Sequence, residues 1–100
     1  MTTGEWLEGH IRAAPEALRD RILALATPEK SGTDTAQALA RIANQTLSAV
    51  IRGAGDRGAA LDLLAADALI TLALLAQAES EPAELGQLSV QLLASGAGAP

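Results

Sequence analysis

The sequence predicts an all-α protein, a compact bundle of four to five helices with a central apolar helix over about residues 57–79. Three observations predict this class. Apolar residues make up 49% of the chain, and most are Ala and Leu, which have high helix propensities. The aromatic and β-branched residues that favour strands are scarce, with one Trp and no Phe or Tyr. The apolar residues also recur three and four positions apart, which is the spacing of one helix face.

The first helical segment is expected to begin at Thr2, because Thr2 and Glu5 form a capping box, and to continue to Ala14. Pro15 interrupts this segment and starts the next one, "PEALRDRILALA". The apolar stripe keeps its register across Pro15, which predicts either one kinked helix or two nearly collinear helices. The stripe consists of Leu7, Ile11, Ala14, Leu18, Ile22 and Leu25.

Loop residues fill positions 27–33, "TPEKSGT", and predict an exposed, mobile connection. Asp34 and Gln37 form a second capping box, which opens a helix that ends near Arg52, with Gly53 as its terminating residue. The expected apolar residues of this helix are Leu39, Ile42, Ala43, Leu47, Val50 and Ile51.

Asp56 is the expected N-cap of the central helix, and Pro82 is expected near the first turn of the last helix. The apolar stripe of the last helix is expected to be Leu85, Leu88, Leu92 and Leu93. The chain is therefore expected to form a single helical domain over residues 1–95, followed by a disordered C-terminal tail over residues 96–100.

The central helix is long and apolar enough to raise the question of a transmembrane segment. Asp62, Asp67 and Gln77 interrupt it, and each Asp costs about 2.5–3.5 kcal/mol near the centre of a membrane, so no transmembrane segment is expected. Four helices rarely enclose one of their number on all sides. We therefore expect a homo-oligomer, most simply a homodimer, to cover this helix. The candidate interface residues are Leu64, Leu69, Leu72, Leu75 and Trp6.

Asp67 is a charge inside an apolar helix, and no basic residue follows Arg57 in the chain. The preferred interpretation is a buried ion pair, in which the partner of Asp67 is His10, an arginine or a residue of a second subunit. A functional acid and simple exposure to solvent are the alternatives.

The remaining candidate motifs favour structural roles. The chain has no cysteine and a net charge of −5, so no disulfide is expected, and a cationic surface for nucleic acid is not expected either. His10 is the only histidine, and the sequence shows neither the serine motif of a catalytic triad nor the Glu-x-x-His motif of a carboxylate metal site. No catalytic residues, no metal and no other cofactor are therefore expected. Trp6 is expected to seal one end of the bundle or to anchor a partner. The acidic residues Glu79, Glu81 and Glu84 either flank a helix start or dock a basic partner.

One stretch resembles a known family. "LLAADALITLALLAQA" over residues 63–78 is similar to the small-residue helix "AGDALL…LA" of all-helical isoprenyl diphosphate synthases. The Asp-Asp-x-x-Asp motifs of that family are absent, so the resemblance implies no activity and no site residues.

These observations favour a small, non-enzymatic, acidic and alanine-rich protein that self-associates as an interaction, scaffold or regulatory module. A protein partner is one possibility that these features leave open. The N-terminal residues do not form a signal peptide, so a cytoplasmic location is expected. A binder of a small apolar ligand in a Leu- and Ala-lined bundle cavity is the alternative. An enzyme that uses Asp67 with His10 or an arginine is a third possibility, and association with a membrane surface a fourth.

Overall fold

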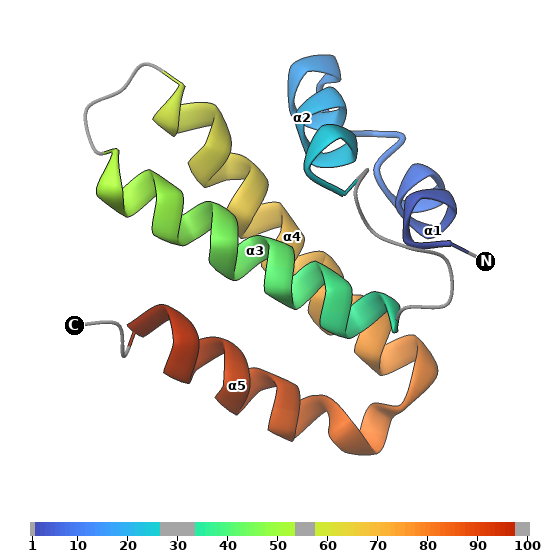
Figure 1. The fold of residues 1–100 in the computed structure, drawn as a ribbon. Coiled ribbons are helices and arrows are strands. Elements are labelled where there is room, and N and C mark those ends of the chain that lie inside the picture. The colour runs from blue at the N-terminus through green and yellow to red at the C-terminus, as the bar shows by residue number, and fades with distance from the viewer. Residues whose placement is uncertain (1, 27–33, 54–57, 98–100) are drawn as a thin grey trace.

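The computed structural model describes residues 2–26, 34–53 and 58–97, and within these ranges the regular structure is entirely helical. The all-α prediction is therefore confirmed. Figure 1 shows α3 and α4 side by side in opposite directions, with α5 along one side of this pair and α1 and α2 on the other. The elements are α1 (Thr3–His10), α2 (Glu16–Ala26), α3 (Thr35–Arg52), α4 (Ala59–Ser80), the 3-10 turn η1 (Pro82–Glu84) and α5 (Leu85–Ala97).

Both predicted capping boxes form hydrogen bonds at helix starts. The Glu5 N–H donates to the Thr2 hydroxyl, and the Gln37 N–H donates to the Asp34 carboxylate, each at 3.1 Å. These side chains satisfy amide groups that have no partner within the helix. The caps therefore fix where α1 and α3 begin.

The N-terminal apolar stripe is shared by two separate helices. α1 ends at His10, earlier than expected, and the Ile11 N–H donates to the Leu7 carbonyl to close it. Because Pro15 disfavours a helical conformation in the residue before it, the chain turns over residues 11–15 and restarts at Glu16. All six stripe residues are nevertheless buried or half-buried, so the predicted inner face of this segment is correct.

α3 and α4 form the centre of the bundle. α4 also contacts α2 and α5, which confirms its central position, and α3 contacts all of the other α-helices. Alanine is frequent in the core, and small side chains allow two helix backbones to approach closely. The buried alanines of α3 and α4 in this core are Ala36, Ala40, Ala43, Ala65, Ala73 and Ala76.

The chain turns through η1 and returns along the bundle as α5. Pro82 begins the 3-10 turn, as its position near a helix start predicts. Leu88 and Leu92 are buried, whereas Leu93 is 68% exposed, contrary to the expected stripe. A helix turns by about 100° per residue, so Leu93 points away from the side that Leu88 and Leu92 share.

α5 is helical through Ala97, and residues 98–100 lie outside the described part of the chain. The predicted domain limit at residue 95 stays a prediction. The expected loop over residues 27–33 and the expected N-cap Asp56 also lie outside the described residues.

Candidate interaction surface

The outer face of α4 is apolar, and most of it is exposed in the described part of the chain, while Leu74 is half-buried against the core. Leu63, Leu64 and Leu75 are 50%, 57% and 41% exposed. Asp67 and Thr71 are exposed on the same face and lie between these leucines. We call this surface the outer α4 face, and it consists of Ala60, Leu63, Leu64, Asp67, Thr71, Leu74, Leu75 and Ala78.

The predicted interface residues of α4 divide between the outer face and the core. Leu64 and Leu75 lie on the outer α4 face, as a self-association surface requires. Leu69 is fully buried and Leu72 is 9% exposed, so in a single chain these two residues belong to the core. Their place at an interface between chains stays a prediction. They lie on the side of α4 that faces the rest of the bundle, so packing within the monomer already removes them from water.

Asp67 occupies the middle of the outer α4 face, and its side chain is exposed to solvent. Within a single chain Asp67 is therefore exposed to solvent, as one of the alternatives expects. The Thr71 hydroxyl donates to the backbone carbonyl of Asp67 at 3.3 Å, a bond that does not use the carboxylate. An ion pair between Asp67 and a residue of a second subunit stays a prediction.

A different aspartate of α4, Asp62, forms an ion pair within the described part of the chain. Arg21 on α2 donates from Nε to Oδ1 of Asp62 at 2.6 Å and from a terminal nitrogen to Oδ2 at 3.2 Å. This two-point geometry is specific to a guanidinium and a carboxylate. The hydrogen bond to Asp62 raises the pKa of Arg21, while partial burial opposes the shift. The sequence alone does not indicate that Arg21 pairs with Asp62, because the two residues are far apart in the chain.

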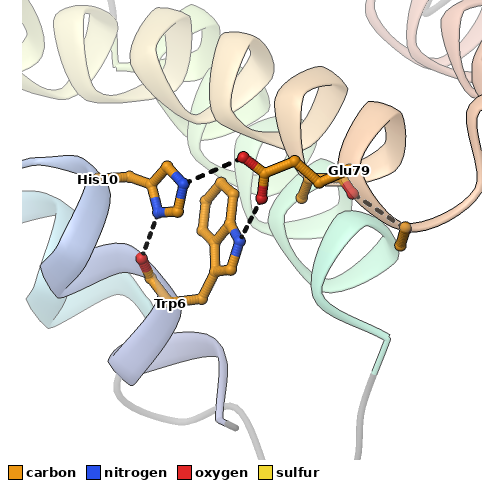
Figure 2. A network of polar contacts seen from close by, with 5 residues as sticks. Trp6, His10 and Glu79 are labelled. Atoms are coloured by element: carbon orange, nitrogen blue, oxygen red, sulfur yellow. Dashed lines mark hydrogen bonds and ion pairs between the residues drawn. The ribbon is translucent and has the colours of Figure 1, made fainter.

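A second polar cluster joins α1 to the C-terminal end of α4, and Figure 2 shows its three side chains converging. The Trp6 indole N–H donates to one oxygen of Glu79 at 3.1 Å, and Nε2 of His10 lies 3.3 Å from the other. The two rings are stacked, with centroids 3.8 Å apart and planes inclined by 16°. Nδ1 of His10 also lies 2.7 Å from the Trp6 carbonyl.

This cluster gives Trp6 and His10 structural roles. Trp6 is half-buried and packs against the core, which agrees with the expectation that it seals one end of the bundle. His10 has the Trp6 carbonyl oxygen beside one ring nitrogen and a Glu79 carboxylate oxygen beside the other, and these contacts hold the ring next to Glu79. Both partners are partly exposed, so water weakens the interaction between them.

The described clefts have polar groups in their walls. A cleft of about 290 Å³ beside the Trp6 cluster includes Asp34, Glu79 and Ser80 in its lining. Another, of about 350 Å³, is lined by Gln37, Arg41, Asn44, Gln45 and Gln91. The first cleft also has Trp6, Ala36 and Ala76 in its walls, so its lining is mixed, whereas polar side chains line the second throughout. Within the described ranges, no group of three or more His, Cys, Asp and Glu side chains could hold a metal ion.

Comparison of the chain with protein-family models, curated proteins and solved structures finds no match. One helix among the described residues, α4, is long and apolar enough to cross a membrane by length and composition. Of the most apolar stretch of α4, 33% is buried inside the chain. A fully enclosed core helix would have a larger buried share. The outer α4 face is therefore the feature of this structure that needs a functional account.

Proposed function

We propose that this protein is a small helical interaction module that self-associates through the outer α4 face and acts as a scaffold or regulatory protein, with a homodimer as the simplest assembly. The observation that carries the proposal is the row of exposed leucines on the central helix, interrupted only by Asp67 and Thr71. Removal of such a surface from water is favourable, in proportion to the apolar area that is buried.

The composition of the outer α4 face favours a protein over a lipid bilayer as its cover. Asp67 lies at the middle of the face, where insertion into hydrocarbon would cost about 2.5–3.5 kcal/mol. Residues 59–100 contain acidic residues and no basic residue, so an anionic membrane surface would repel this half of the chain. A cytoplasmic location agrees with this proposal and with the lack of cysteine.

A non-enzymatic role is part of the proposal. Asp67 lies on an exposed helix face, and it is not in the lining of any cleft described above. Catalytic carboxylates are held in clefts beside a second reacting group, where water is excluded. His10 is engaged with Trp6 and Glu79 and does not join Asp67 in a common site.

The proposal is tested by the molar mass in solution, measured by sedimentation equilibrium over a range of micromolar concentrations. We expect twice the 10.1 kDa of one chain. Leu64→Lys should dissociate the assembly, because burial of an unpaired ammonium group at an apolar interface is costly. Val90→Lys is the matched control, since Val90 is 65% exposed but lies on α5.

Each outcome has a definite meaning for the outer α4 face. An assembly that Leu64→Lys disrupts and Val90→Lys leaves intact supports the proposal. An assembly that only Val90→Lys disrupts would place the interface on α5 and contradict it. A wild-type chain that remains at 10.1 kDa throughout would refute self-association.

A further inference from the structure

The outer α4 face has the same pattern when it is followed in either direction along the helix. Position 69 is its midpoint, and each residue on one side has a chemically similar or complementary counterpart at the same distance on the other. The matched positions are Ala60 and Ala78, Leu63 and Leu75, Leu64 and Leu74, and Asp67 and Thr71.

The spacing of these residues is also that of a helix-pairing seam. Positions 60, 64, 67, 71, 74 and 78 are separated alternately by four and three residues, which is the heptad pattern of two packed helices. Leu63 and Leu75 lie on the two flanks of this seam. The seam positions are exposed except Leu74, which is half-buried against the core, while α3 packs against the other side of α4.

From this pattern, and given the self-association proposed above, we infer that two copies pair their α4 helices antiparallel about a two-fold axis at the level of Leu69, with Asp67 of each copy opposite Thr71 of the other. An antiparallel two-fold axis brings each position on one side of the midpoint to the level of its counterpart on the second copy. Leucines then meet leucines in two layers, and alanines meet alanines at the two ends.

The polar residues decide the orientation. A parallel pair would place Asp67 directly against Asp67 of the other copy, and two carboxylates that share a site repel each other. The antiparallel pair places each carboxylate opposite a hydroxyl group, which can donate a hydrogen bond to it. Thr71 is able to do so, because its present bond to the Asp67 backbone carbonyl, at 3.3 Å, is long for a hydroxyl donor.

Asp67 is in this arrangement a positioning residue for the assembly. A single polar residue within an apolar seam fixes the register and orientation of paired helices at some cost in affinity. This role gives a reason for the presence of a charged residue, Asp67, in the most apolar part of the chain. In this arrangement the partner of the Asp67 carboxylate is the Thr71 hydroxyl of the second copy.

The inference is tested by cysteine cross-linking, which is unambiguous because the chain has no cysteine of its own. Ala60→Cys and Ala78→Cys are introduced singly, since both alanines are exposed. We expect a disulfide when the two variants are mixed, because positions 60 and 78 of different copies then lie together. Each variant alone should form little disulfide, since the two copies of one position would be about 27 Å apart along the axis at 1.5 Å per residue.

The cross-links distinguish failure of this inference from failure of self-association. An assembly of two chains in which each single variant cross-links with itself would show parallel pairing, and would overturn the inference while the proposed function stands. An assembly that gives no cross-link in any combination would overturn the inference alone. A monomeric mass, or a chain that floats with phosphatidylcholine vesicles instead of self-associating, would overturn both.

The role of Asp67 is measured in the same experiment with Asp67→Leu added to each cysteine variant. We expect the single variants to begin to cross-link with themselves, because the charge that disfavours parallel pairing has been removed. Asp67→Asn is the matched control, since it keeps a polar group in the seam and should keep the preference for the mixed disulfide. An unchanged preference in the Asp67→Leu proteins would overturn the assignment of Asp67.

Discussion

Replacement of leucine by alanine at two nearby positions of α4 should separate folding from assembly. Leu69 is fully buried, whereas Leu64 is 57% exposed. The substitution removes the same atoms at both positions and keeps a good helix former. We expect Leu69→Ala to lower the stability of the monomer and Leu64→Ala to weaken the dimer.

The magnitudes follow from the burial of each side chain. Leu→Ala removes about three carbon groups, each worth about 0.8 kcal/mol when buried. At Leu69, with the added effect of the cavity, the free energy of unfolding should fall by about 2–5 kcal/mol. Leu64 is 57% exposed in the monomer, so less than half of its transfer energy contributes there, and the fall should be about 1 kcal/mol.

The exposed part of Leu64 becomes important when two copies associate. Burial of that 57% contributes about 1.4 kcal/mol in each copy, and about 2.7 kcal/mol in a symmetric dimer. Because each 1.4 kcal/mol is a factor of ten, the dissociation constant of Leu64→Ala should rise by about 100-fold.

Two assays measure these effects independently. Urea denaturation followed by circular dichroism gives the stability of the monomer when the protein is dilute. Sedimentation equilibrium at higher concentration gives the dissociation constant. The reasoning is refuted if Leu64→Ala destabilises the monomer as much as Leu69→Ala does, or if it leaves the dissociation constant unchanged.

The two polar clusters lead to further predictions. Arg21→Gln should lower the free energy of unfolding by about 1 kcal/mol, because it leaves the half-buried Asp62 without its guanidinium. In urea denaturation, Asp62→Asn should then lower the free energy of unfolding less in the Arg21→Gln protein than in the wild type. Glu79→Ala should change the emission spectrum of the single tryptophan and speed amide exchange in α1, since it removes the acceptor that ties α1 to α4. Unchanged exchange in α1 would show that apolar packing alone holds this helix.

The local features of the fold could be predicted with good accuracy from the sequence. Capping residues, proline positions and apolar spacing act over three or four residues, so they identified α3, α4 and the N-terminal stripe. The end of α1 was placed too late, because apolar spacing continues through Ile11 and Ala14 while the backbone has already left the helix. The Arg21–Asp62 pair was missed, since nothing local relates two residues on different helices.

The sequence by itself determined that this protein is helical, where most of its helices lie, and that its central helix is apolar on nearly every side. Only the tertiary structure decided which side of that helix is covered. Periodicity selects a buried face when polar residues occupy the opposite one, and α4 has too few polar residues to select it. The packing of the other helices against α4 buries Leu69 and leaves Leu64 and Asp67 exposed. Burial is a property of the whole fold, because it depends on contacts between segments that are distant along the chain.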